Sequence, residues 1–186
     1  MPRATHRREP HPAGGAHPRP AVGGWLRLAG PSDAADIAGL RTSVAQDLTA
    51  KFGHGPWSAG ASERSVFANP GRSRTFGAWQ SDRLMASLTL ATKKPWAIDV
   101  AYFTPCETPL YLHSMAVDPT VQRTGVGRRC LEEVVRICRD WPAGAIRLDA
   151  YDAEAGAGGF YRRCGYTEVG RVVYRRTPLV YYELVL

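Results

Sequence analysis

Apolar residues recur along this chain at two different spacings, and these spacings predict both helices and strands. Intervals of three and four residues predict one helix that begins at Ser32 or Asp33 and another over 127–140. A further short helix is expected over 60–68. Alternation predicts strands over 25–28, 75–79, 84–91, 110–117, 146–151, 166–174 and 179–185. Strands and helices in this order indicate an α/β (α+β) fold, in which helices flank a mixed sheet.

Two segments of the chain, 110–117 and 152–163, have an unusual composition. The stretch 110–117 is apolar at most positions, which predicts a central strand covered on both faces. Segment 152–163 contains Gly156, Gly158 and Gly159, and an interior glycine costs a helix roughly 1 kcal/mol relative to alanine. We therefore expect only a short or distorted helix there. Close approach of the backbone to a ligand and simple loop composition explain the glycines equally well.

A glycine-rich turn follows the central strand and opens the next helix. Asp118 and Pro119 end the strand, and Gly125 and Gly127 lie at the helix start. Unpaired N–H groups and the positive end of the helix dipole favour an anion there, and glycines leave room for phosphate oxygens. Further positive charge comes from Arg123, Arg128 and Arg129. The alternative interpretation is a tight strand-to-helix connection that binds no ligand.

Two common nucleotide motifs do not match this turn. A dinucleotide-binding fingerprint needs a third glycine near position 130, where the chain has Cys130. An ATPase-type phosphate loop needs Gly-Lys-Ser or Gly-Lys-Thr, and Lys51, Lys93 and Lys94 do not lie beside a suitable glycine. Neither class of nucleotide-binding protein is supported.

The turn does match another signature. Residues 122–127, read as Gln-Arg-Thr-Gly-Val-Gly, resemble the Q/R-x-x-G-x-G/A signature of the GNAT superfamily of acyl-CoA-dependent N-acyltransferases. A second family element, A-x-x-φ-Y-x-x-x-G-φ, is similar to residues 157–166 and lies downstream in the correct order. The resemblance extends over residues 25–186. One departure is Glu154, which stands where the family usually has asparagine.

The resemblance implies a mainly antiparallel sheet with a splayed strand pair that receives acetyl-CoA as co-substrate. Main-chain groups of Met115, Ala116 and Val117 would pair with the pantetheine arm. The pyrophosphate would be held at the turn by Gln122, Arg123, Thr124, Gly125, Val126, Gly127 and Arg128. The implied activity is direct transfer of the acetyl group to a primary amine of a small molecule or peptide.

Tyr161 and His113 are the candidate catalytic residues. Tyr161 stands at the family's position for the acid that protonates the sulfur of coenzyme A; the alternative is a core aromatic residue. His113 is the first candidate for the general base, because strand alternation places it on the face shared with Met115 and Val117. A half-buried structural histidine is an equal alternative, and Glu107, Tyr111 and Glu154 are weaker candidates.

The acceptor would meet the segments 46–60 and 92–109. The aromatic residues of these segments either line a pocket for an amine or seal the core beneath long loops; they are Trp57, Trp96, Tyr102 and Phe103. Asp99 and Glu107 either attract a cationic amine or belong to the solvated surface. The acceptor itself is left open.

Composition divides the chain into a basic tail and one domain. Residues 1–22 lack apolar periodicity and are expected to be disordered, and residues 23–186 are expected to form a single domain. The tail contributes Arg3, Arg7, Arg8, Arg19 and Glu9 to a formal net charge of +7. The four cysteines are scattered, which favours reduced thiols over disulfides or a zinc site. We expect a cytoplasmic protein without a metal or a membrane segment, and leave open whether it forms a homodimer.

Two other classes of function remain as alternatives. A non-catalytic acyl-CoA sensor would keep the glycine turn but need neither acid nor base. A basic nucleic-acid-binding module is suggested by the net charge, but the chain lacks an RNA-type aromatic motif and zinc-ligand spacing. The transferase is the interpretation that both motifs favour.

Overall fold

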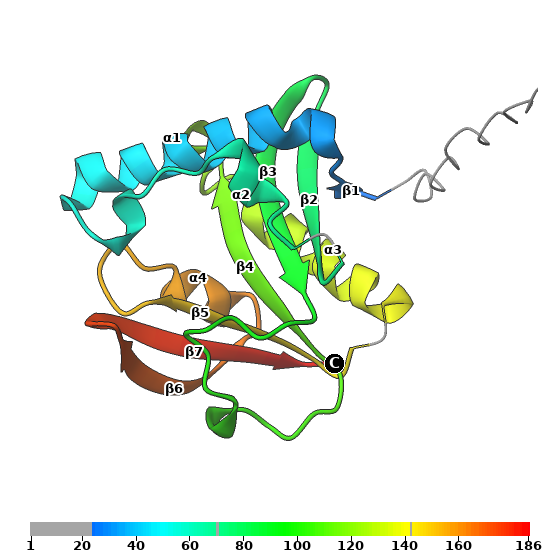
Figure 1. Cartoon of the computed structure of the whole chain (residues 1–186), viewed down its shortest axis with the longest axis vertical. Helices are drawn as coiled ribbons and strands as arrows, with labels where there is room; N and C mark the ends of the chain where they lie inside the picture. The colour runs from blue at the N-terminus through cyan, green and yellow to red at the C-terminus, as the bar shows by residue number, and fades with distance from the viewer. Residues whose placement is uncertain (1–23, 70, 142) are drawn as a thin grey trace, which may run out of the picture.

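One mixed sheet organises the molecule, which is described by a computed structural model over residues 24–69, 71–141 and 143–186. The tail predicted over 1–22 lies outside the described residues. The sheet has the strand order β1-β2-β3-β4-β5-β7-β6 (Figure 1). Its strands are β1 (Arg27–Leu28), β2 (Ser73–Gln80), β3 (Arg83–Ala91), β4 (Pro109–Val117), β5 (Ala145–Tyr151), β6 (Thr167–Tyr174) and β7 (Thr177–Val185). Neighbouring strands are antiparallel except for the parallel pair β4 and β5, which confirms the predicted mixed, mainly antiparallel sheet.

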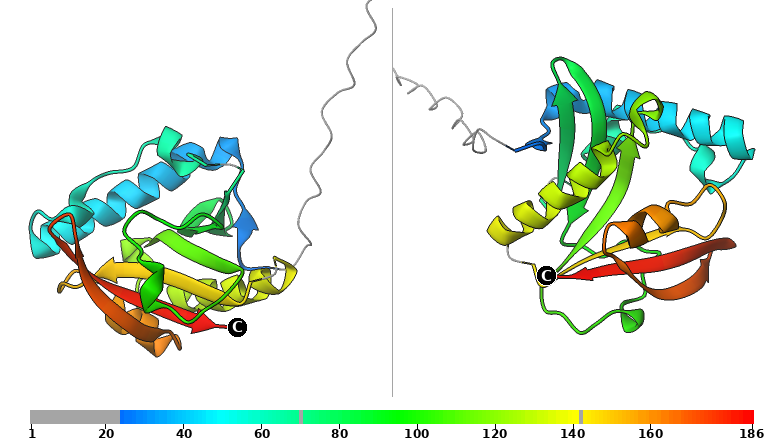
Figure 2. Two further views of the ribbon diagram at one scale, coloured as in Figure 1. Left: turned by 60° about the horizontal axis from the view of Figure 1, so that its bottom comes forward. Right: turned by 180° about the vertical axis from the view of Figure 1, so that it is seen from behind.

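Helices cover both faces of this sheet. Helices α1 (Ala34–Phe52) and α2 (Glu63–Val66) lie on one face, which we call the α1 face. Helices α3 (Val126–Asp140) and α4 (Gly158–Arg163) lie on the other, the α3 face (Figure 2). The molecule therefore has three layers, with the sheet in the middle (Figure 2).

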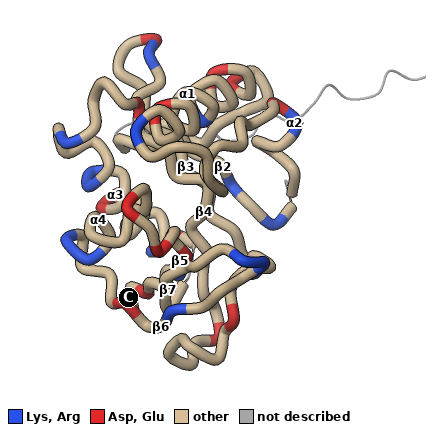
Figure 3. Tube along the Cα trace, turned by 90° about the vertical axis from the view of Figure 1, so that its left-hand side faces the viewer, with Lys and Arg blue, Asp and Glu red and all other residues tan. Residues whose placement is uncertain are grey.

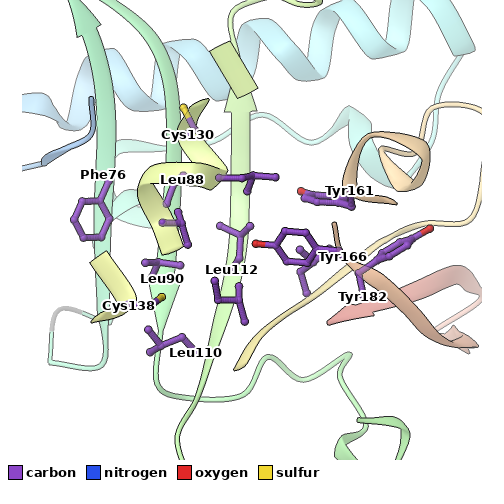
Figure 4. Close-up of a cluster of buried hydrophobic side chains, with 14 of the residues drawn as sticks. Phe76, Leu88, Leu90, Leu110, Leu112, Cys130, Cys138, Tyr161, Tyr166 and Tyr182 are labelled. Atoms are coloured by element: carbon purple, nitrogen blue, oxygen red, sulfur yellow. The ribbon is translucent and has the colours of Figure 1, made fainter. Parts of the chain in front are cut away.

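The larger core lies between the sheet and α3. Leucines of β3 and β4 interdigitate there with the inward side chains of α3, among them Cys130 and Cys138 (Figure 4). Tyr161, Tyr166 and Tyr182 extend this core toward α4. Full burial of one such leucine contributes about 1.5–3 kcal/mol, so the core fixes α3 firmly against β4.

A smaller core lies on the α1 face. Ile37 and Leu40 of α1 pack there on Val66 of α2 and Ala116 of β4. Since Ala116 belongs to this cluster, the far end of β4 is fixed from the α1 side as well as by the larger core.

The long loop between β3 and β4 is also fastened to the sheet. Phe103 and Ile98 pack on Tyr111 and Tyr181 in a third buried cluster. Beside this cluster, buried Arg147 and Glu183 form an ion pair with a distance of 2.9 Å between Nε and Oε1. The loop's Thr104 N–H donates to the same carboxylate at 3.1 Å. The loop is thus held against the sheet by these contacts.

Some element boundaries differ from the prediction. β1 and α2 are shorter than the segments 25–28 and 60–68, at two and four residues. The predicted linker 175–178 is a two-residue turn, because Tyr174 already pairs with Thr177. Arg175 and Arg176 have φ values of 47° and 69°, the left-handed conformation that a two-residue hairpin needs. The sequence concealed this turn because it carries neither glycine nor asparagine there.

The glycine-rich segment before α4 is shaped by its own chain. As expected, the helix is short, at six residues. A Cβ on Gly156 would lie 1.9 Å from the carbonyl oxygen of Tyr151, so only glycine fits at this close approach. The contact lies between two parts of the backbone, which explains this glycine without a ligand.

Candidate active site

The turn after β4 leaves the start of α3 open. Gly125 precedes the first helical residue with φ = 95°, a conformation that strains any residue with a side chain. No side chain of the described residues caps the helix there. The N–H groups of Val126, Gly127 and Arg128 belong to the first turn and have no carbonyl partner within it. Together with the dipole of a 15-residue helix, these donors have the geometry of an anion site.

Polar side chains of the turn brace its main chain. The amide Nε2 of Gln122 donates to the carbonyl oxygen of Val117 at 3.1 Å, which ties the turn to the end of β4. The hydroxyl of Thr124 donates to the carbonyl oxygen of Val121 at 2.7 Å. Both side chains are occupied by protein groups, so they position the turn.

The three arginines near the turn have different surroundings. Arg128 reaches across to α4, where its NH2 donates to the carbonyl oxygen of Arg163 at 3.0 Å. The guanidinium of Arg129 lies over the ring of Trp25, 4.0 Å from the centroid. Arg123 is exposed and has φ = 66°. Of the three, Arg129 contacts an aromatic ring, whereas Arg123 is exposed to solvent beside the turn.

The central strands diverge next to this turn. β4 and β5 pair only between Pro109–Tyr111 and Ala145–Arg147. Beyond these residues the two strands splay apart, and α4 lies near the gap (Figure 1). On its other edge β4 stays paired with β3 as far as Val117. Within the described part of the chain, the β5-facing edge of Met115, Ala116 and Val117 therefore has no strand partner, and an extended ligand can pair with it.

A β-bulge in β4 corrects the predicted placement of His113. Ser114 has φ = 52°, and the register with β3 shifts between His113 and Ala116. Alternation is therefore broken. His113, opposite Thr89, faces α1, whereas Met115 and Val117 pack against the core on the α3 face. The prediction that His113 shares a face with Met115 and Val117 is wrong, because the bulge adds one residue to the strand.

Coverage of β4 also changes along its length. Leu110, Tyr111 and Leu112 are buried, as expected for a strand covered on both faces, but Ser114 is exposed. The second half of the strand borders the gap along its β5 side, but Ala116 is buried against α1, and Met115 and Val117 pack on the α3 face. The prediction of coverage on both faces therefore holds except at the bulge, where Ser114 is exposed.

Tyr161 reaches the gap from α4. Its phenol donates to the sulfur of Met115 at 3.9 Å, a weak contact that brings the hydroxyl to the splayed part of β4. The ring is buried among Phe160, Tyr166 and Tyr182. Burial raises the pKa of Tyr161 well above its ordinary value, and the nearby charge of Asp149 adds to this. The hydroxyl stays protonated at neutral pH and is available as a donor.

His113 lies beside a half-buried arginine. Arg41 of α1 donates from NH2 to Oγ1 of Thr89 at 3.0 Å and from Nε to Oγ of Ser87 at 3.4 Å. Thr89 is the strand partner of His113. Burial, and then the charge of Arg41, lower the pKa of His113 to about 4. The imidazole is therefore neutral at pH 7, and it is a weak proton acceptor.

Asp149 on β5 occupies the other side of the gap. Ile146, Leu148 and Ala150 face the larger core, so Asp149 faces the α1 side of the sheet. Burial raises the pKa of its carboxyl, and no cationic side chain of the described residues forms an ion pair with it. Its charge in turn raises the pKa values of Tyr151 and Tyr161. Asp149 is thus a carboxylate at the gap and close to the phenol of Tyr161.

An aromatic contact bridges the α1 side of the gap. The ring of Trp57, in the segment after α1, meets the ring of Tyr151 edge-on, with centroids 5.7 Å apart. Tyr151 ends β5. The contact joins the segment 46–60 to the strand that carries Asp149.

The other aromatic residues proposed for the acceptor pocket lie elsewhere. Phe103 is buried in the cluster beneath the 92–109 loop, which is the core-sealing alternative. Tyr102 stacks edge-on against Tyr181 with centroids 5.5 Å apart. Trp96 is 83% exposed. Of the four aromatic residues, Trp57 contacts Tyr151, at the end of β5 beside the gap.

The weaker base candidates lie in other surroundings than His113 and Asp149. Tyr111 is buried in the cluster beneath the loop, and Glu107 and Glu154 are exposed. Among the described residues no group of three or more His, Cys, Asp or Glu side chains is placed to hold a metal ion. Within the same residues no helix combines the length and apolarity needed to cross a membrane.

Sequence inspection missed Arg41 and Asp149, although each left a signal. Arg41 lies four residues after Ile37 and three before Val44, on the apolar side of its helix. Asp149 and Arg147 are the two charged residues of a strand whose other side chains are apolar or aromatic. A charged residue at a core-facing position is uncommon without a functional or structural reason.

Comparison with known proteins identifies the family. A mixed sheet whose central parallel strands splay apart beside an open helix start is the fold expected of an acyltransferase. The chain belongs to the acetyltransferase (GNAT) family, whose model matches residues 42–166. This confirms the resemblance found in the sequence. No curated protein matches the chain.

Solved structures share the fold. An acetyltransferase of the GNAT family from Listeria monocytogenes is 19% identical, covering 87% of this chain and 94% of its own, with a TM-score of 0.65. The ribosomal-protein-S18-alanine N-acetyltransferase from Escherichia coli is 16% identical, with coverages of 86% and 92% and a TM-score of 0.63. The protein yncA from Salmonella typhimurium, solved with its cofactor acetyl-CoA, is 13% identical, with coverages of 87% and 92% and a TM-score of 0.60. At these identities the likeness shows the fold.

Proposed function

We propose that this protein is an N-acetyltransferase that transfers the acetyl group of acetyl-CoA to a primary amine of a small molecule or peptide. The observation that carries the proposal is the juxtaposition of the open start of α3, the unpaired edge of β4 and the phenol of Tyr161. These three features offer an anion site, a strand-like docking edge and a proton donor around one gap. Membership of the GNAT family supports it, because that family uses acetyl-CoA.

The main chain of this protein fits acetyl-CoA. The N–H groups of the turn from Gln122 to Arg128 would hold the pyrophosphate, since the first turn of α3 has no side-chain cap among the described residues. The unpaired edge of Met115–Val117 would hold the pantetheine arm as an added strand. When bound, acetyl-CoA supplies an acetyl thioester as the acyl donor.

Transfer requires a C–N bond to form while the C–S bond breaks. An ammonium acceptor first loses one proton to a base, and the neutral amine loses a second proton as the amide forms. The departing sulfur takes up one proton, so the protein must hold groups for both transfers. Tyr161 would donate a hydrogen bond to the sulfur, because burial keeps its hydroxyl protonated. Its raised pKa favours hydrogen bonding over complete release of the proton, so Tyr161 lowers the charge on sulfur until a proton arrives.

Two groups would receive the proton of the amine. His113 is the choice made from the sequence, and Asp149 is the competitor that the structure adds. The raised pKa of Asp149 makes its carboxylate a better acceptor than an ordinary aspartate, and its negative charge attracts an ammonium group. The charge of Arg41 opposes formation of an imidazolium at His113.

Binding and turnover test the proposal in sequence. Acetyl-CoA and coenzyme A should raise the Tm of the protein, by an amount that grows with ligand concentration. Release of the coenzyme A thiol from acetyl-CoA, measured with a panel of primary amines, should exceed the rate without an amine. Binding without turnover on any amine would favour the acyl-CoA sensor, and absence of binding would exclude both functions.

The nucleic-acid alternative has a separate test. Figure 3 shows basic residues spread over different parts of the surface and interrupted by acidic ones in that view. Salt-dependent binding of DNA or RNA that persists in excess coenzyme A would revive this alternative.

A further inference from the structure

The α1 face of the gap holds an arginine that has no acidic partner. Among the described residues, the ion pairs of the structure do not include Arg41, whose donors meet only the hydroxyls of Ser87 and Thr89. Two neutral acceptors leave the charge and most of the five guanidinium N–H donors unbalanced. Arg41 is half-buried, and a charge that is partly removed from water is stabilised by a counter-ion. Burial alone lowers the pKa of Arg41, to about 10, which agrees with the missing carboxylate.

Arg41 lies at the level where the strands separate. Its partner Thr89 is paired with His113, and its partner Ser87 is paired with Ala116, so the guanidinium lies over the bulge of β4. This bulge lies in the part of β4 beyond the residues that pair with β5. An anion bound at Arg41 would therefore lie on the α1 side of the gap between β4 and β5.

Asp149 supplies the opposite charge across the gap. It lies on β5, whereas Arg41 lies over β3 and β4, and both face the α1 side. The nearest arginine on the same strand face, Arg147, is already paired with Glu183 and is buried. The charge of Asp149 acts on Tyr161, whose phenol marks the position of the thioester in the proposed function. An amino group next to Asp149 would therefore also be next to the acetyl group.

We propose that the acceptor is a small amine that carries a carboxylate, held with its carboxylate on Arg41 and its amino group at Asp149. Amino acids and short peptides with free carboxyl ends belong to this class. A guanidinium binds a carboxylate through two parallel hydrogen bonds, which suits the free donors of Arg41. Trp57 and Tyr151 touch at the end of β5, and Tyr151 lies on the same face of that strand as Asp149. The inference rests on the proposed N-acetyltransferase function.

Matched acceptors test this inference in the wild-type protein. Each natural amino acid is compared with its α-amide, which keeps the amine and the side chain but lacks the negative charge, in the thiol-release assay. The best acid should exceed its amide by about 10- to 100-fold in kcat/KM, the effect of a lost charged hydrogen bond. Equal rates for acids and their amides would overturn the substrate class, while turnover of both would leave the transferase proposal intact. Absence of acetyl-CoA binding would instead remove the transferase itself.

A variant pair locates the effect at Arg41. Arg41→Gln should lower kcat/KM for the best acid about 10- to 100-fold, chiefly through KM, and lower that of its amide far less, so the preference collapses. Arg139→Gln removes the same charge from the exposed end of α3 and should keep the preference. In the presence of coenzyme A, the acid should raise the Tm of the wild type and of Arg139→Gln more than that of Arg41→Gln. Equal loss for acid and amide in Arg41→Gln would overturn the role of Arg41; if that variant does not fold, the wild-type comparison decides.

Discussion

The two sides of the gap between β4 and β5 are built from different kinds of groups. On the α3 side, the N–H groups at the start of α3 and the edge of β4 belong to the main chain. On the α1 side, the polar groups are side chains of Arg41, His113 and Asp149, which come from three different elements. A main-chain site needs a backbone shape, whereas a side-chain site needs particular residues brought together by the fold. The first can be recognised in a sequence, and the second becomes visible only in the structure.

The glycine turn shows why the cofactor side could be predicted. Gly125 has a backbone conformation that few other residues adopt, so its place in the sequence records the shape of the turn directly. The helix that follows was predicted within one residue, because its apolar stripe faces the larger core. The strands of the sheet were predicted for a similar reason, since apolar side chains concentrate in them and are buried there.

The bulge at Ser114 shows why the acceptor side could not be predicted. One added residue turns His113 to the opposite face from Met115, and no glycine or proline announces it. Arg41 and Asp149 are far apart in the sequence. They come to the same gap between β4 and β5 because α1 packs on the sheet and β5 splays away from β4. The spacing of residues along the sequence predicts which side chains share a face of one helix or strand. It does not predict a site to which three separate elements contribute.

The largest effect is expected at Tyr161, the one side chain to which the proposed mechanism gives a catalytic role on the α3 side. Tyr161→Phe should lower kcat about 10²- to 10³-fold, because the departing sulfur loses its donor. Stability should change little, since the hydroxyl gives up only the 3.9 Å contact with Met115. Steady-state kinetics with acetyl-CoA, beside a thermal melt of the variant, measure both. An unchanged kcat in a folded Tyr161→Phe protein would remove Tyr161 from catalysis.

A second test asks which side chain on the α1 side receives the proton. Asp149→Asn should lower kcat about 10- to 100-fold, whereas His113→Gln should lower it less, because the pKa of His113 of about 4 makes the ring a weak base. That pKa also predicts the pH profile. Because the ring is neutral above pH 5, the pH–activity profiles of the wild type and of His113→Gln should have the same shape near pH 6.5. An inflection that disappears in His113→Gln would restore His113 as the base.

The main-chain character of the cofactor side can be tested with two glycines of similar conformation. Gly125→Ala and Gly53→Ala both place a side chain at positive φ, 95° and 75°, and each should cost about 1–2 kcal/mol of stability. Only Gly125→Ala should also weaken acetyl-CoA binding, about tenfold, because its Cβ lies beside the N–H groups of the turn. Calorimetric titration of both variants with acetyl-CoA separates strain from lost binding, and an equal Kd for the two would refute the anion site at this turn.

The smallest expected effects concern the arginines beside the turn. If main-chain donors supply most of the affinity, Arg129→Gln should change the Kd of acetyl-CoA by less than about twofold, because its guanidinium is held over Trp25. Arg123→Gln should weaken binding about two- to fivefold, since an exposed charge near a polyanion contributes modestly and is screened by salt. The difference between wild type and Arg123→Gln should therefore shrink as the salt concentration rises from 50 mM to 500 mM. A loss of 100-fold or more in either variant would mean that side chains, and not the backbone of the turn, hold the pyrophosphate, and the contrast between the two sides of the gap would disappear.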